Sequence, residues 1–177
     1  MQLPAPHKSH PVRAEQIILF RASSQVFAVS SSSVQEVRSV DSLAGAAVEI
    51  NEPSIPKVRH AIRRGDRNQY VVSAAMHFDL RPSPAALIFI LRKSRVALLV
   101  DGIEKMTSMT RLQALPGAFC YEERVWYRGL TVLDQNVIPV VSPAGFLTPA
   151  EISLLDAVTG SQALSEVTGA ANSGLSL

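Results

Sequence analysis

The sequence predicts a mostly β protein, because its apolar residues fall into short runs that are separated by polar turns. These runs are rich in β-branched residues, and most are bounded by Ser, Gly, Pro, Asn or Asp. They cover residues 16–22, 25–30, 46–50, 69–75, 86–92, 95–101, 125–133 and 137–142. Many short strands are typical of a barrel or sandwich, whereas an α/β fold shows longer helical stretches between its strands. With 177 residues, 47% of them hydrophobic, the chain suits one globular domain with a core of its own.

Two pairs of runs lie so close together that each is predicted to form a tight hairpin. The tips are residues 22–25 (ASSQ) and residues 92–95 (RKSR). The hairpins also resemble each other, since each reads as an apolar run, an Arg, a polar turn and a second apolar run.

The similarity continues after each hairpin and indicates two small β units built on one plan. A short apolar segment comes next in each half, followed by an Arg-Gly pair and then by an apolar strand. In the first half these are Val34–Val37, Arg64-Gly65 and Tyr70–Ala75, and in the second half they are Ile103–Met106, Arg128-Gly129 and Val137–Val141. Four matches in the same order favour a duplication over chance.

The carboxy-terminal part is predicted to change from strand to helix. Thr148 and Glu151 match a capping box, Pro149 suits the first helical position, and Gly160 is expected to end the helix. The Ser-, Gly- and Ala-rich segment that follows has few large side chains to bury. The expected divisions are a disordered lead at residues 1–13, a domain at 14–147, a helix at 148–160 and a flexible tail at 161–177.

Composition limits the compartment and the kinds of site. The single cysteine, Cys120, allows neither an intramolecular disulfide nor a cysteine-based zinc site, which is natural in a reducing cytoplasm. The amino terminus has no apolar core of the kind a signal peptide needs. The longest apolar stretch, Ala85–Leu91, is far too short to span a bilayer, so no direct membrane contact is expected.

Charge is small in total but unevenly distributed. The net charge is +2, which is too low to argue for nucleic acid. Between Lys57 and Arg95, however, the sequence has nine Lys or Arg and only two Asp, which gives this segment a local net charge of +7. From Gly129 onward there are four acidic residues and no Lys or Arg. The basic segment is either a face that meets an acidic partner or a polyanion, or a solvated loop.

The common catalytic signatures are absent from the sequence. It has no Gly-rich phosphate loop, no G-x-S-x-G and no H-E-x-x-H, and its four His are scattered, so no enzyme activity, metal site or cofactor is predicted. Ser54 and Lys57 match the S-x-x-K spacing of acylating enzymes, but the companion motifs are missing and chance explains the match better. Trp126 and Tyr127 are expected to pack in the core rather than to stack on bases.

Three stretches of sequence together resemble the CheW family of chemotaxis coupling proteins. They are IILFRASSQVFAVSSSSVQEV (residues 17–37), VALLVDGIEKM (96–106) and RVWYRGLTVLDQNVIPVVSPAGFL (124–147). The shared features are an opening hairpin, a V-x-E-V segment, an Arg-Gly pair, a Val-Asp after the central hairpin, and a late Gly followed by an apolar strand. No single motif is specific, but the ordered set is moderately specific, and the resemblance covers roughly residues 14–147, most of the chain.

This resemblance implies two five-stranded β-barrels packed side by side, with no catalysis and no cofactor. CheW-like proteins are cytoplasmic adaptors. One surface binds the regulatory domain of a CheA-type histidine kinase, which is itself CheW-like, and another binds the helical cytoplasmic tip of a chemoreceptor. A receptor then influences the kinase through contacts alone, as a coupling free energy between two surfaces.

By the same resemblance, four residues are the candidates for partner binding. Glu36 and Arg64 would form a charged pair beside the receptor-binding groove, and Val34 and Val37 would supply apolar contacts to receptor helices. Alternatively, Glu36 and Arg64 form only a surface ion pair. The second half keeps the family pattern well, including Pro139, which suggests that kinase docking is retained at a strand edge or irregularity.

The first half departs from the family pattern just before Arg64. Arg59, His60, Ala61, Ile62 and Arg63 replace the usual apolar run, and the usual Pro in the next strand is missing. Two other functions stay open on the sequence. One is a small basic β-barrel that binds nucleic acid through the +7 segment. The other is an enzyme that uses Ser54 and Lys57 or an unrecognised His and Asp pair.

Overall fold

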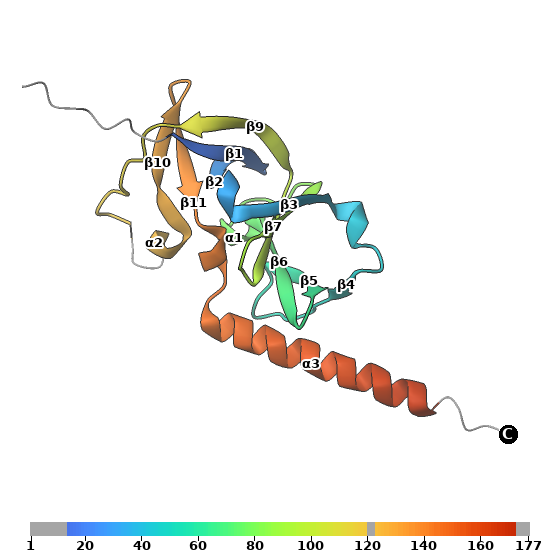
Figure 1. Cartoon of the computed structure of the whole chain (residues 1–177). Helices are drawn as coiled ribbons and strands as arrows, with labels where there is room; N and C mark the ends of the chain where they lie inside the picture. Colours follow the sequence, from blue (N-terminus) through green and yellow to red (C-terminus); the bar gives the residue numbers. More distant parts are fainter. Residues whose placement is uncertain (1–13, 120–122, 173–177) are drawn as a thin grey trace, which may run out of the picture.

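Two β-sheets packed against each other form the body of the protein (Figure 1). The computed structural model describes residues 14–119 and 123–172, with side chains as far as Ser161. The lead expected at residues 1–13, Cys120 and the last five residues of the expected tail lie outside the described residues. None of the described helices is both long and apolar enough to span a membrane.

The first sheet, called sheet A, has five strands in the order β10-β11-β2-β1-β9. They are β1 (Glu15–Ala22), β2 (Gln25–Ser30), β9 (Gly102–Met109), β10 (Tyr127–Leu133) and β11 (Asn136–Val141). Strand β1 pairs antiparallel with β2 and β9, and β10 pairs antiparallel with β11. The exception is the parallel contact of β11 with β2, which is short and involves only Val140 and Val141 on β11.

The second sheet, called sheet B, has six strands in the order β3-β7-β8-β6-β5-β4. They are β3 (Val34–Ser39), β4 (Ala47–Glu49), β5 (Val58–Arg64), β6 (Arg67–Ser73), β7 (Leu87–Leu91) and β8 (Val96–Val100). Strands β6 and β8 are parallel, and the other neighbours are antiparallel. The short edge strand β4 makes this sheet one strand larger than the expected five.

Each sheet combines a hairpin from one half of the sequence with strands that follow the hairpin of the other half. Hairpin β1–β2 pairs with β9 and β11 from the second half, and hairpin β7–β8 pairs with β3 and β6 from the first half. The orders β10-β11-β2-β1-β9 and β5-β6-β8-β7-β3 are therefore equivalent. The duplicated plan is present, but its two units interleave along the chain.

One of the four repeated features does not hold in space. Arg64-Gly65 lies at the tip of the β5–β6 hairpin, where Gly65 has a φ of +62°. Arg128-Gly129 lies inside β10, at a break in its pairing with β11, and the equivalent tip is Asp134-Gln135. The two Arg-Gly pairs thus occupy different positions, one at a hairpin tip and one inside a strand. Two identical residues do not by themselves determine where a strand ends.

The three hydrophobic cores explain why the hairpin strands read as continuous apolar runs. A central core lies between the sheets, and a smaller core lies on the other side of each sheet. Along β1, Ile18 and Phe20 contribute to the central core, whereas Ile17 and Leu19 contribute to the core behind sheet A. Strands buried on both faces lose the alternation of polar and apolar residues that marks a half-exposed strand.

Both hairpin tips lie where the sequence placed them, but one strand in the basic segment was missed. Ala22 pairs with Gln25 at the first tip, and residues 92–95 join β7 to β8. The first part of the basic segment is not a solvated loop but strand β5. Arg59 and Arg63 are exposed on β5, whereas Val58 and Ala61 are buried, so one side of the strand still faces the core.

Contacts between strands that are far apart in the order of each sheet show that both sheets curl. In sheet B, the Nη1 atom of Arg64 on β5 lies 3.8 Å from the Oε2 atom of Glu36 on β3, although three strands separate β3 from β5. In sheet A, Gln113, which follows β9, exchanges two backbone hydrogen bonds of 2.7 and 2.9 Å with Leu130 on β10. These contacts give each subdomain a rolled shape.

The carboxy-terminal helix α3 runs from Pro149 to Asn172 and does not end at Gly160 as expected. The capping box is formed, since the Thr148 amide donates to Glu151 and the Glu151 amide donates to the Thr148 hydroxyl. A single Gly costs a helix about 1 kcal/mol, which the residues around it can offset. Figure 1 shows the last part of α3 extending beyond the strands.

Among the described residues, five short helical elements connect the strands and α3. They are η1 (Ser31–Ser33), η2 (Val40–Leu43), α1 (Ala74–His77), α2 (Glu123–Trp126) and η3 (Pro143–Phe146). His77 of α1 stacks on Phe146 at 3.8 Å between ring centroids and meets Trp126 edge-on at 4.4 Å. Trp126 and Tyr127 pack against the central core, as expected.

We expect His77 to make the fold acid-sensitive. Burial, reinforced by the charge of Lys57, lowers the pKa of His77 to about 4 from 6.5. Between these two values the unfolded chain binds a proton that the folded chain rejects, so stability falls as the pH drops from 6.5 toward 4. His77→Phe keeps the aromatic contacts and should flatten this dependence. Urea unfolding at pH 7 and pH 5 measures it, and a wild-type pH dependence in the His77 variant would contradict the expectation.

We expect Gly129→Ala to destabilise the fold by about 2 kcal/mol or more, because an added Cβ has no room. The new atom would collide with the carbonyl oxygen of Gln113 and touch the side chain of Leu112. Gly117→Ala meets nothing within 4 Å and serves as the matched control. Equal unfolding midpoints for the two variants would show that the contact of Gln113 with β10 is not needed.

Candidate protein-interaction site

Strand β3 carries three of the four candidate residues and forms one edge of sheet B. It pairs with β7 alone, and the pairing shifts register between Val34 and Glu36, so Gln35 lies in a bulge. Val34 is 7% exposed and belongs to the central core, whereas Val37 is 40% exposed. The two valines therefore differ in role. Val34 anchors the strand, and Val37 presents an apolar side chain to solvent.

Glu36 is the centre of a small charged cluster on this edge. Arg38 donates to both of its carboxylate oxygens, from Nε at 2.8 Å and from Nη2 at 3.1 Å. Arg64 lies 3.8 Å away on the tip of another hairpin. The hydrogen bonds from Arg38, with the charges of both arginines, hold the pKa of Glu36 below its usual value. The carboxylate thus stays ionised at neutral pH.

The expected pair of Glu36 and Arg64 is brought together, but the sequence analysis missed the closer partner. Arg38 lies two positions after Glu36 on the same strand, and side chains two apart point to the same face. That spacing is the signal that identifies Arg38. The position of Arg64 needed the structure, because it depends on how the sheet curls.

A groove in sheet A, here called the apolar groove, opens where β11 separates from β2. Its lining residues come from five strands and the β10–β11 turn, and they are Leu19, Gln25, Val26, Glu104, Lys105, Leu133, Asp134, Asn136, Val137, Ile138 and Pro139. Pairing with β2 starts only at Val140, and Pro139 immediately before it has no N–H to offer. Pro139 was expected at a strand edge or an irregularity, and it lies in the interior strand β11 at the point where pairing with β2 stops. Val137 beside it is 61% exposed.

The apolar groove has an ion pair that is equivalent to Glu36 and Arg64 but carries the opposite charges. The Nζ atom of Lys105 on β9 lies 2.7 Å from Asp134 at the tip of β10–β11. Lys105 matches Glu36 when VQEV is aligned with IEKM. In each subdomain an ion pair therefore joins an edge strand to a hairpin tip, and the acidic and basic partners are exchanged between the two subdomains.

Ser54 and Lys57 do not form a catalytic pair. The Ser54 hydroxyl donates to Glu52 at 2.6 Å, and the Lys57 ammonium pairs with Glu151 at 2.8 Å. Each group is bonded to a different carboxylate, so Lys57 is not placed to activate Ser54. Among the described residues, no three His, Cys, Asp or Glu side chains are grouped as a metal would require.

These features describe a domain made of two β subdomains, one with an exposed strand edge that carries a charged cluster and the other with an open groove. The family model for the CheW-like domain matches residues 16–151, and the chain belongs to this family. The resemblance found in the sequence is therefore confirmed. CheW-like proteins are non-enzymatic scaffolds, so this chain is a chemotaxis scaffold or adaptor.

A solved structure has the same fold. It is the scaffolding protein TtCheW from Thermoanaerobacter tengcongensis, with a TM-score of 0.58 and 14% sequence identity. The similarity covers 73% of this chain and 89% of that chain. At this identity the likeness concerns the fold. No curated protein sequence matches the chain.

Proposed function

We propose that this chain works in the cytoplasm and couples chemoreceptors to a CheA-type histidine kinase. The observation that carries the proposal is the CheW-like domain match over residues 16–151, joined to two exposed surfaces on different sheets. One surface is the β3 edge with Glu36, Val37 and Arg64. The other is the apolar groove. A scaffold that joins two partners needs two such surfaces.

The β3 edge is the proposed contact for the helical cytoplasmic tip of a receptor. Val37 offers an exposed apolar side chain on one face of this edge strand, and Glu36 with Arg64 offers charges of both signs on the other face. A helix that docks along the edge can meet both, because docking helices carry an apolar stripe bordered by polar residues. Val34 contributes from inside the core, by holding β3 in place.

The apolar groove is the proposed contact for the regulatory domain of the kinase. Its exposed Val137 and its neighbours Val26 and Ile138 give an apolar centre, and Lys105 and Asp134 give it a charged rim. An apolar centre with a polar rim is the usual anatomy of a protein interface. Strands β1 and β2 line this groove with one face and the central core with the other, and Val34 of β3 packs in that core, so binding at one surface can bias the other by about 1 to 3 kcal/mol.

Reversing the charge of Glu36 should weaken receptor binding and leave kinase binding intact. Glu36→Arg places three arginines together, and we expect roughly tenfold weaker binding of a receptor-tip fragment. Titration calorimetry with the receptor fragment and with the kinase regulatory domain measures both affinities. Glu49→Arg, on the opposite edge of sheet B, is the control. Equal losses for both partners would point to damaged folding instead.

A charge inside the apolar groove should have the opposite selectivity. We expect Val137→Asp to weaken kinase binding by roughly tenfold or more, because the interface would have to bury a carboxylate. Val48→Asp changes another exposed valine, on β4, and should bind the kinase normally. Unchanged kinase binding by the Val137 variant would remove the apolar groove from the proposal.

A further inference from the structure

A second groove, here called the basic groove, lies in sheet B at the position equivalent to the apolar groove. Its lining residues are Gln35, Arg64, Arg67, Asn68, Gln69, Leu91, Lys93, Ser94 and Arg95. Strands β6 and β8 run parallel from Tyr70 and Val96 onward, so the groove lies just outside the paired part, as in sheet A. The exposed valine and the proline of the apolar groove are replaced here by polar and cationic residues.

Four cationic side chains from two hairpin tips converge on this groove. Arg64 and Arg67 flank the β5–β6 turn, and Lys93 and Arg95 belong to the β7–β8 turn. The lining residues that the structure describes include no acid. Cations held together by the backbone repel one another, and an anion between them relieves that repulsion. Three of these cations, Arg67, Lys93 and Arg95, belong to the +7 segment and have no role in the receptor proposal.

Most of this positive charge is only weakly neutralised within the chain. Among the described residues, Arg64 Nη1 is buried and has no hydrogen-bond partner, its nearest carboxylate being Glu36 at 3.8 Å. Arg67 is paired only with the adjacent Asp66, at 3.9 Å and largely in solvent. No ion pair to Lys93 is present among the described side chains.

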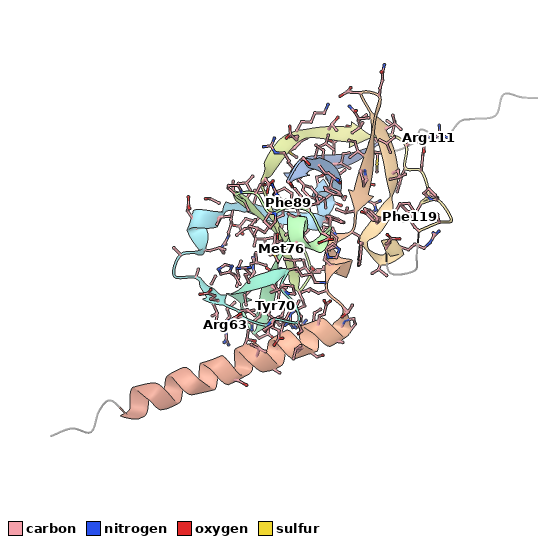
Figure 2. All side chains as sticks on the ribbon, turned by 180° about the vertical axis from the view of Figure 1, so that it is seen from behind. Arg63, Tyr70, Met76, Phe89, Arg111 and Phe119 are labelled. Atoms are coloured by element: carbon pink, nitrogen blue, oxygen red, sulfur yellow. The ribbon has the colours of Figure 1, made fainter. Side chains whose placement is uncertain are left out.

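One carboxylate of the chain itself is already bound beside this groove. Asp156 of α3 receives hydrogen bonds from Arg95 and from the Tyr70 hydroxyl. Burial opposes ionisation of Asp156, but these hydrogen bonds outweigh it and lower the pKa of the carboxyl. Figure 2 shows Tyr70 on the side of sheet B that faces α3. A carboxylate carried on a helix is therefore already bound at the rim of the basic groove.

We infer that the basic groove binds an acidic helical segment of a protein partner, whose carboxylates pair with Arg64, Arg67 and Lys93. The groove continues from the β3 edge, because Gln35 and Arg64 border both surfaces. A helix that lies on β3 and extends over the groove would present its acidic residues there. This identification of the partner as the receptor-side helix rests on the proposed function.

Carboxylates suit the groove better than a nucleic-acid backbone does. The net charge of the chain is only +2, and the carboxy-terminal region from Gly129 onward is acidic, so a long polyanion would meet repulsion beyond the groove. A short acidic helix needs only the local cluster. Arg111, an exposed cation, lies at the far end of the molecule from Arg63 and Tyr70 (Figure 2), so it does not extend the positive charge of the groove.

The test uses the full chain and a labelled alanine-based peptide of about 15 residues, in which Glu recurs at helical spacing. We expect this peptide to bind, and its Gln counterpart not to bind. The variant Arg67→Glu/Lys93→Glu should bind the Glu peptide about tenfold more weakly. The variant Arg81→Glu/Arg111→Glu changes the net charge equally at exposed sites outside the groove and should stay within about twofold of the wild type.

Three outcomes would overturn the inference. They are no binding of the Glu peptide to the wild type, equal losses in the two double variants, or tighter binding of single-stranded DNA that is lost in the groove variant. The last outcome would assign the groove to nucleic acid. The peptide assay contains no receptor, so it tests anion binding by the basic groove even if the wild-type chain does not bind a receptor. Loss of the proposed function and loss of this inference are thus separate results.

Discussion

The central core between the two sheets is the constraint on which the rest of the structure depends. Hairpins β1–β2 and β7–β8 face each other across it, with Phe20 and Phe89 in edge-to-face contact at 5.8 Å. Each hairpin is buried on both faces and anchors one sheet. The β3 edge and the apolar groove extend from these two hairpins, so their relative position is set by the central core. Close-packed interiors transmit strain, which is what a mechanical adaptor requires.

The interleaving of the two units gives this core a further property. Because each hairpin pairs with strands from the other half of the chain, neither half can complete a sheet alone. A single folding unit carries both surfaces, and a disturbance of one sheet reaches strands that belong by sequence to the other. The repeated plan also explains the two equivalent grooves. Their chemistry differs, apolar in sheet A and basic in sheet B, which allows two partners to be distinguished on similar frames.

Local features of the fold could be predicted from the sequence, whereas pairings between distant strands could not. The hairpin tips and the capping box of α3 depend on neighbouring residues, and both were found. Strand β5 was missed because three arginines and a histidine interrupt its apolar residues, so the strand does not read as an apolar run. The end of α3 was placed too early because one glycine was given more weight than the whole helix. The nearness of Glu36 and Arg64 was predicted from the family resemblance. The exchange of strands between the two halves could not be predicted, because no local sequence pattern indicates which distant strands pair.

Capture of a ternary complex tests the central claim most directly. The kinase regulatory domain is fixed to a surface, and a receptor-tip fragment is passed over it with and without this chain. The account predicts that the fragment is retained only when the chain is present, and that the amount retained follows the amount of chain bound. Retention that does not depend on the chain, or displacement of the chain by the receptor fragment, would contradict the account.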